Sequence, residues 1–593
     1  IKMQNPILKS LSTTNRLSSE IRILKNRGFS KWRRLPSTSA VATRNYSAMP
    51  EQEKNVISSV YPDIVVPNEN LATYTWKTIK NHENLVAAVC GVTGRSYTYS
   101  QLRDMSAAVA SRLLAVLKLQ PGDTVALVSP NVPEFPAVIM GGVEAGMIIT
   151  TVNPLYTAEE ISRQLVNSGS KAVFAADESI SVVTEAVKSL PEPIPIIVIS
   201  TEGKQCPQGC IKFSEFANPK NVDFTIVDKA LANSKPNDVC LMPYSSGTTG
   251  LPKGVELTHN NITSNCEMLQ AGENPLVTPA SGSFQDVIPC VLPMFHIYGL
   301  VVNMASKLQL GCKLVTLPKF SPDTFLQAQA DHKGTLLHLV PPIVLFLSAH
   351  PSVEPRHLES VNVVMSGAAP LGASDVERFK ERAPKVQFTQ GYGMTETSPV
   401  TLIGDRNVEN YASVGNPTPS TDCKIVSLET GENLGPDQVG ELWVRGPQVM
   451  KGYHNNEEAT KDIFKGNGWL STGDMSYYDE NGFFYITDRL KELIKVKGFQ
   501  VPPAELEAIL RTHPDLSDAA VIGVSHPISG EVPKAFVVAK AGQAVIPEDV
   551  QEYVSKRVAV YKQLKGGVQI VTSIPKNPAG KIMRRELKAM YGL

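Results

Sequence analysis

The chain has 593 residues, enough for roughly two to four domains of ordinary size. Hydrophobic residues make up 42% and charged residues 19%, a globular composition with enough apolar side chains for several cores. Lysine plus arginine equals aspartate plus glutamate at 57 each, so net charge gives no reason to expect nucleic acid or an anionic membrane as a partner. No apolar run is long enough to span a bilayer, because Glu144 interrupts one candidate and Pro341-Pro342 breaks the other.

The first 48 residues differ from the rest of the chain. They carry many lysines, arginines, serines and threonines but only one acidic residue, Glu20, which is the composition of an organelle transit peptide. The stretch Arg44-Asn45-Tyr46-Ser47 resembles a mitochondrial processing site with cleavage after Tyr46. We therefore expect import into mitochondria. The alternatives are a disordered basic leader, or sequence upstream of a start at Met49, with a cytoplasmic or peroxisomal protein. The C-terminal tripeptide Tyr591-Gly592-Leu593 is not a peroxisomal address.

From about residue 85, short β-rich runs alternate with helical patterns. The buried strands expected first are Asp123–Ser129, Met147–Val152, Lys171–Ala176 and Ile194–Ser200. Between them, Thr157-Ala158-Glu159-Glu160 is a capping box that opens a helix. This alternation predicts an α/β fold, with parallel sheets covered on both faces in a large N-terminal domain spanning 49–488.

The eight cysteines are scattered along the chain. Only Cys206 and Cys210 lie close together, and no histidine pair or second Cys-x-x-Cys accompanies them. We therefore expect free, buried thiols in a reducing compartment rather than a zinc site.

A phosphate-binding loop is predicted at residues 244–254, whose sequence is Tyr-Ser-Ser-Gly-Thr-Thr-Gly-Leu-Pro-Lys-Gly. Its hydroxyl and backbone N–H groups can face a polyanion, and Lys253 adds a positive charge. It is not a Walker A loop, because Pro252 precedes the lysine where that motif needs glycine.

Together with three further motifs, this loop resembles the adenylate-forming superfamily of acyl-CoA synthetases, beetle luciferases and 4-coumarate–CoA ligases. The other motifs are Ser366–Gly372 (SGAAPLG), Gln390–Glu396 (QGYGMTE) and Ser471–Asp474 (STGD). The resemblance runs from about residue 60 to the end, and the 4-coumarate–CoA ligase branch matches best.

The resemblance implies the nucleotide site. Tyr392 would stack on adenine, Thr395 would hold the α-phosphate, and Glu396 would bind Mg²⁺, which takes few protein ligands. Asp474 and Arg489 would bind the ribose, with Lys491 at a pivot. The full set expected to contact nucleotide or CoA is Ser245, Ser246, Gly247, Thr248, Thr249, Lys253, Lys319, Ala368, Gln390, Gly391, Tyr392, Thr395, Asp474, Arg489, Lys491, Lys497 and Gly498.

Residues 489–593 are expected to form a small, mobile α+β domain. Its predicted strands are Ala519–Val524, Ala535–Ala539 and Val568–Val571, around one helix near 547–559.

The segment 488–500 would by itself predict an amphipathic helix with a solvated lysine face. The resemblance instead makes it the thioester-forming segment, with Lys495 and Gln500 facing the acyl-adenylate and Lys497 and Gly498 along the CoA channel. It also places Lys581, in the turn Pro575–Lys581, in the site during adenylation.

The acyl site is expected around His296 and Tyr298, in the segment Met294–Gly299. By resemblance, His296 lies beside the acyl carboxylate. Val301, Leu339 and Met365 stand where plant 4-coumarate–CoA ligases often have Asn, Met and Lys, and Trp443 replaces a cysteine of their second signature. Because valine and methionine cannot donate a hydrogen bond to a ring hydroxyl, an alkyl tail is favoured.

The expected activity is ligation of an acid to CoA through an acyl-AMP, using ATP and Mg²⁺, with a medium- or long-chain fatty acid as substrate. The alternatives are an arylpropenoate ligase of the 4-coumarate type, a luciferase-like monooxygenase, and an inactive protein that binds acyl-adenylate or fatty acid. Intact Lys253, Glu396 and Lys581 argue against an inactive protein. The partners expected are the acid, ATP and CoA, with no nucleic acid and no transmembrane segment.

Overall fold

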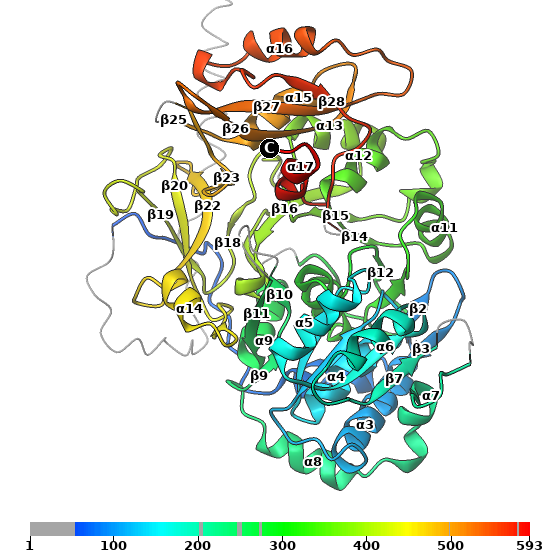
Figure 1. Ribbon diagram of the computed structural model, residues 1–593. Helices are drawn as coiled ribbons and strands as arrows, with labels where there is room; N and C mark the ends of the chain where they lie inside the picture. The colour runs from blue at the N-terminus through cyan, green and yellow to red at the C-terminus, as the bar shows by residue number, and fades with distance from the viewer. Residues whose placement is uncertain are drawn as a thin grey trace, which may run out of the picture. The chain divides into compact units, whose positions relative to one another are not determined.

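A computed structural model describes residues 54–200, 205–245, 252–271, 275–369, 371–496, 499–577 and 580–593 (Figure 1). The basic leader, most of the serine/glycine loop, and Lys497 with Gly498 therefore lie outside the described residues. In the part described, no helix combines the length and the apolar content needed to cross a membrane.

A nine-stranded sheet forms the first half of the large domain, in the order β10-β11-β9-β5-β4-β6-β7-β8, with β21 paired to β11. Its central strands run parallel and agree with the four predicted runs. The bounds are β4 Thr124–Val128, β5 Ile148–Val152, β6 Ser170–Ala176, β7 Ile196–Ile199, β8 Ile211–Lys212, β9 Val239–Leu241, β10 Tyr244–Ser245, β11 Lys253–Thr258 and β21 Gly452–Tyr453.

Helices cover both faces of this sheet (Figure 1). Val125 and Leu127 of β4 belong to the core that includes α3 and α4, while Ala126 and Val128 belong to the core that includes α5 and α6. This alternation follows from the period of two along a strand. The helix bounds are α2 Leu71–Trp76, α3 Tyr99–Ala115, α4 Phe135–Glu144, α5 Ala158–Ser168, α6 Ile180–Lys188, α7 Phe213–Phe216, α8 Phe224–Asn233 and α9 His259–Met268.

The predicted capping box at the start of α5 is present. The Thr157 side chain accepts from the Glu160 N–H, and the Glu160 carboxylate accepts from the Thr157 N–H at 2.8 Å.

Two further sheets follow in the large domain, and the segment Met294–Gly299 comes directly after a strand of one of them. One has the order β14-β15-β16-β17-β18 and the other β12-β13-β2-β3. Between β12 and β13 the chain forms a π-helix, η4 (Tyr298–Ala305), and the short helix α10 (Ser306–Leu308). The remaining bounds are β2 Val86–Cys90, β3 Ser96–Thr98, β12 Val287–Cys290, β13 Lys313–Thr316, β14 Leu336–Leu339, β15 Val363–Ser366, β16 Gln387–Gly393, β17 Val400–Ile403, β18 Asn416–Pro417, α11 Pro322–His332, α12 Pro341–Ala349 and α13 Ala373–Arg382.

The last part of the large domain is an antiparallel sheet, which the expectation of parallel sheets did not include. Its order is β1-β19-β20-β22-β23, and it carries Asp474 on β22 next to Arg489 on β23. The bounds are β1 Ile57–Ser58, β19 Asp422–Val426, β20 Gly440–Arg445, β22 Leu470–Tyr478, β23 Phe484–Arg489 and α14 Glu457–Ile463.

The C-terminal residues form a sheet with a core of their own, in the order β25-β24-β27-β26, with β28 paired to β27. The amphipathic-helix alternative for residues 488–500 is wrong, because this segment pairs as β24 and β25. Helix α15 was not predicted, and it packs its apolar face into this core. The bounds are β24 Ile494–Val496, β25 Phe499–Val501, α15 Pro503–Arg511, β26 Leu516–His526, β27 Gly530–Ala539, α16 Pro547–Ser555, β28 Val568–Ile570 and α17 Arg584–Met590.

Candidate active site

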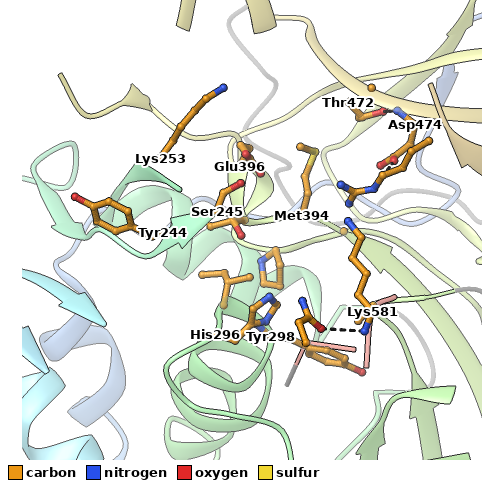
Figure 2. A pocket seen from close by; sticks show the side chains of 18 of the residues that line it. Tyr244, Ser245, Lys253, His296, Tyr298, Met394, Glu396, Thr472, Asp474 and Lys581 are labelled. Atoms are coloured by element: carbon orange, nitrogen blue, oxygen red, sulfur yellow. Dashed lines mark hydrogen bonds and ion pairs between the residues drawn. The ribbon is translucent and has the colours of Figure 1, made fainter. Parts of the chain in front are cut away.

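A cavity of about 720 Å³ lies where these sheets meet, and the turn that carries Lys581 lines it together with residues of the large domain (Figure 2). The residues that line it include most of the described site residues predicted from the sequence. These are Ser245, Lys253, His296, Tyr298, Met365, Ala368, Gly391, Tyr392, Thr395, Glu396, Asp474, Arg489, Lys491 and Lys581.

The Asp474 carboxylate is the centre of the corner predicted to bind ribose. Tyr392 donates its hydroxyl to Asp474 Oδ2 at 2.5 Å, and Arg489 Nε lies 3.3 Å from Oδ1. The Asp474 N–H donates to the Thr472 hydroxyl at 3.1 Å, which fixes the strand around it. Burial, and then the nearby Asp474 charge, raise the pKa of Tyr392 well above its ordinary value. Tyr392 therefore stays protonated and acts as a donor.

Glu396 is a buried carboxylate on the same cavity wall. Tyr453 donates its hydroxyl to Glu396 Oε1 at 2.8 Å, and Lys253 Nζ lies 4.7 Å from the centre of the Tyr453 ring. Figure 2 shows Lys253 and Glu396 on the side of the cavity nearest to Ser245. A cation and a carboxylate are thus held at the base of the predicted phosphate loop. A single carboxylate suits Mg²⁺, which keeps several waters when it binds phosphates.

His296 lies in a turn that two buried side chains hold in place. Asn131 donates its amide to the carbonyls of Cys290 and Leu292, both at 2.8 Å, and accepts from the Met294 N–H at 2.7 Å. Thr151 donates its hydroxyl to the carbonyl of Phe295 at 2.7 Å.

The His296 ring is neutral and its tautomer follows from its hydrogen bond. Nδ1 accepts from the Tyr298 N–H at 3.3 Å, so the proton is assigned to Nε2. Burial, and then the charge of Lys581, lower the pKa of His296 to about 4. A neutral N–H donor lining the cavity can bind a carboxylate oxygen.

Lys581 enters the cavity from the C-terminal domain, opposite His296 (Figure 2). Its N–H donates to Asn577 Oδ1 at 2.9 Å, and Gly580 adopts a left-handed φ of 76°, so the turn is tightly fixed. Burial, and then the neighbouring Arg489, lower the pKa of Lys581 to about 8. A desolvated ammonium is thus placed between the ribose corner and the acyl site.

Tyr298 and Met365 line the part of the cavity that is predicted to hold the acyl group. The Tyr298 hydroxyl donates to the Met365 carbonyl at 3.3 Å, so its proton is already used in a hydrogen bond to the backbone. The Met365 methyl lies against Gly391, where a Cβ would come within 2.5 Å of it. Met365 therefore gives this part of the wall an apolar side chain, packed against Gly391.

Five predicted site residues do not line the cavity. Lys319 is exposed on the loop after β13. Val301 on η4 and Leu339 on β14 lie in the cores behind the cavity wall. Gln390 donates its amide to the carbonyls of Leu371 and Tyr411, so it links β16 to the segments that carry these two residues. Lys495 is exposed on β24.

Some predicted residues fall outside the described part of the chain. These are Ser246, Gly247, Thr248, Thr249, Lys497 and Gly498, and the side chain of Gln500.

Sequence reasoning missed Asn131, Thr151 and Tyr453. Each acts through contacts with residues distant in the sequence, and an isolated Asn, Thr or Tyr gives no signal of such a role.

Comparison with known proteins agrees with these motifs. A sequence model described as AMP-binding enzyme matches residues 75–454, and one described as AMP-binding enzyme C-terminal domain matches residues 505–581. The chain belongs to the AMP-binding enzyme family.

Curated relatives extend over most of the chain. The 4-coumarate–CoA ligase 3 of Arabidopsis thaliana is 39% identical over 544 residues, covering 90% of this chain and 94% of its own length. The probable 4-coumarate–CoA ligase 3 of Dictyostelium discoideum is 36% identical and also covers 90% of this chain and 98% of its own length. The resemblance predicted from the sequence is confirmed, and the chain is an AMP-forming acid–CoA ligase.

Solved structures agree on the fold. The ATP-bound MatB of Rhodopseudomonas palustris superimposes with a TM-score of 0.78 at 27% identity, covering 88% of this chain and 99% of MatB. The large α/β domain with a smaller C-terminal domain is therefore confirmed.

Proposed function

We propose that this enzyme activates a medium- or long-chain aliphatic acid. A carboxylate oxygen of the acid attacks the α-phosphorus of ATP, the bond to pyrophosphate breaks, and acyl-AMP forms. The CoA sulfur, after losing its proton, then attacks the acyl carbonyl and displaces AMP. The observation that carries this proposal is the convergence of Lys581, His296 and Asp474 on one cavity whose acyl end is apolar.

The first step brings two anions together, and the cavity offers groups that offset their repulsion. The Lys581 ammonium stabilises the charge that develops as pyrophosphate leaves, and the neutral His296 orients the acid. Asp474 would accept hydrogen bonds from the ribose hydroxyls. Arg489 and Tyr392 hold the Asp474 carboxylate in the orientation that this requires. We further propose that Glu396 holds Mg²⁺, which supplies charge neutralisation on the phosphates.

The aliphatic substrate is supported by the acyl end itself. Met365 is a flexible thioether that a linear chain can displace, whereas a rigid hydroxyaryl group finds no free polar partner in Tyr298 or Met365. The rival is an arylpropenoate such as 4-coumarate, and the identity to 4-coumarate–CoA ligases supports it.

Formation of AMP, measured with and without CoA, tests the proposal. The acids compared would be hexanoate, octanoate, dodecanoate, hexadecanoate and 4-coumarate. We expect kcat/KM to rise with chain length until the cavity is full, because each buried methylene contributes up to about 0.8 kcal/mol. If 4-coumarate exceeded every alkyl acid, the aliphatic proposal would be wrong.

We also propose that residues 1–48 direct the enzyme to mitochondria, on the basis of their basic, acid-poor composition. A fusion of residues 3–60 to a fluorescent protein should be imported and shortened. A diffuse cytosolic signal from an uncleaved fusion would refute this.

A further inference from the structure

Three polar side chains are fully buried in the core just beyond the acyl end of the cavity. They are Asn303 on η4, Lys307 on α10 and His338 on β14, and each has an exposed fraction of 0%. Among the described residues, no partner hydrogen-bonds to the Asn303 amide, to Lys307 Nζ or to either ring nitrogen of His338. Burying such groups unpaired costs on the order of 1–3 kcal/mol each, so a cluster of three is unusual.

His338 connects this cluster to the cavity wall. His338 pairs in register with Met365 across the parallel strands β14 and β15, so both side chains lie on the same face of the sheet. The His338 ring also meets the Tyr298 ring edge to face, with centroids 6.0 Å apart. His338 thus lies beside Tyr298 and Met365, which both line the cavity.

The π-helix connects the cavity to the deeper part of the cluster. Tyr298 begins η4, Asn303 lies on the same helix, and Lys307 follows on α10. Burial, and then the charge of Lys307, lower the pKa of His338, so the two side chains lie near each other. At about 1.5 Å per residue or less, Tyr298 and Lys307 are separated by roughly 10–14 Å along the helix axis.

Met365 is the movable part of the barrier. Its methyl lies in the small space that Gly391 leaves open, and no hydrogen bond holds the thioether there among the described contacts. Methionine has three rotatable bonds and repacks at low cost. A chain entering between Tyr298 and Gly391 can therefore push the Met365 side chain aside and reach His338.

Lys307 determines which chemical group could bind at the far end of a chain that passes Met365. It makes no ion pair with any described residue, and the neighbouring Asp286 already accepts from the Thr335 hydroxyl at 2.6 Å and from the Thr278 N–H at 2.8 Å. Burial lowers the pKa of Lys307, and the nearby Cys312, Cys266 and Asp286 offset this effect only in part. An anionic oxygen would pair with this ammonium, and Asn303 and His338 offer further donors to it.

We propose that the acyl site extends past Met365 to Asn303, Lys307 and His338, and that the preferred substrate is an aliphatic dicarboxylic acid. One carboxylate is adenylated beside His296, and the other pairs with Lys307. This inference rests on the proposed aliphatic acid–CoA ligase activity and specifies its substrate class. The methylene chain that joins the carboxylates would then lie against Tyr298 and Met365.

The test compares octanoate with octanedioate, and decanoate with decanedioate, on the full chain. The readout is kcat/KM for AMP formation in the presence of CoA, with 4-coumarate as a further arm. The variants are Lys307→Met, which keeps the side-chain volume and removes the charge, and Lys313→Met as a matched control on the partly exposed β13. Urea unfolding of each variant shows whether it is folded, and calorimetric titration of octanedioate without ATP measures binding apart from catalysis.

We expect the unaltered enzyme to prefer each dicarboxylate to its monocarboxylate by about tenfold or more. Lys307→Met should lower kcat/KM for dicarboxylates about thirtyfold or more, abolish octanedioate binding, and leave monocarboxylates unchanged or improved. Lys313→Met should behave as the unaltered enzyme does.

Two results would overturn the inference while leaving the aliphatic ligase intact. One is turnover of monocarboxylates with no preference for dicarboxylates, and the other is an equal loss on both acids in a folded Lys307→Met variant. Failure to form AMP from any alkyl acid, or a preference for 4-coumarate over all of them, would instead refute the proposed function and the inference together.

Discussion

Two titratable side chains set the chemistry of the site at the residue scale. Burial lowers the pKa of both, to about 4 for His296 and to about 8 for Lys581. Near neutral pH the site therefore contains a neutral imidazole and a protonated amine. This combination orients a carboxylate without transferring a proton to it, and it places a positive charge where the phosphate charge develops.

The lowered pKa of Lys581 predicts the pH dependence of adenylation. The ammonium is the active form, and it is lost as pH rises through about 8 in the free enzyme. We expect kcat/KM for ATP-dependent pyrophosphate release to fall above that pH, by up to tenfold per pH unit.

A Lys581→Arg variant provides the control for this pH profile. Its guanidinium stays charged across the range, so the variant should be slower overall but show no decline near pH 8. A decline that persists unchanged in Lys581→Arg would assign the titration to another group.

At the element scale, the contact between β16 and β17 positions the nucleotide motif. Gly393 ends β16 opposite Val400, and a Cβ there would lie 2.0 Å from the Pro399 carbonyl oxygen. Backbone atoms cannot rotate away as a side chain can. Any side chain at Gly393 would therefore separate the two strands, and Tyr392 and Glu396 would move with β16.

Gly393→Ala should consequently impair adenylation more than stability. A displacement of about 1 Å in positioning groups can cost on the order of 10²-fold in rate, whereas overpacking costs about 1–3 kcal/mol of unfolding free energy. Pyrophosphate exchange and urea unfolding would measure the two effects.

Gly435→Ala is a suitable control, because a Cβ there meets only Asn55 Nδ2, at 3.9 Å. An adenylation rate of Gly393→Ala equal to that of this control would show that the strand contact does not position the motif.

The elements also show what the sequence could and could not predict. The central strands and the α5 capping box were predictable, because buried parallel strands are continuous apolar runs and caps have local signals. The antiparallel sheet was not, since its strands carry mixed patterns such as Leu470–Tyr478. Segment 488–500 has a helical lysine spacing, yet tertiary pairing makes it β24 and β25.

The site shows the same limits in particular residues. Motif position identified Asp474 and Lys581, which line the cavity, but it could not show that Gln390 turns toward Tyr411. Val301 was expected at the acyl wall, but on the π-helix η4 it is buried in the core and does not line the cavity. A helix with i→i+5 hydrogen bonds cannot be distinguished from an α-helix by apolar spacing alone.

At the scale of the whole molecule, the small domain presents two different lysines on two different surfaces. Lys581 lines the cavity, whereas Lys495 is exposed on β24, where its N–H donates to Glu531 Oε2 at 2.9 Å. Both belong to the domain that follows β23, and the link from Arg489 to β24 is short. A rotation about this link would exchange one surface for the other, so a single cavity could serve both half-reactions.

This exchange predicts opposite defects in two variants. Lys581→Ala should lose adenylation by about 10²–10³-fold, because the ammonium is needed where the two anions meet. It should still convert synthetic acyl-AMP and CoA into acyl-CoA, since Lys581 has then rotated away. Lys495→Ala should retain adenylation and slow thioester formation, because a side chain contributes only to the transition state that it contacts.

Pyrophosphate release and thioester absorbance follow the two half-reactions separately. Lys491→Ala, in the link between β23 and β24, extends the comparison, because a change in the proposed rotation itself should slow the full cycle more than either isolated half-reaction. If folded Lys581→Ala and Lys495→Ala lost both half-reactions to the same extent, rotation could not explain their roles. The two lysines would then support one fixed site, and the exposure of Lys495 on β24 would require a different explanation.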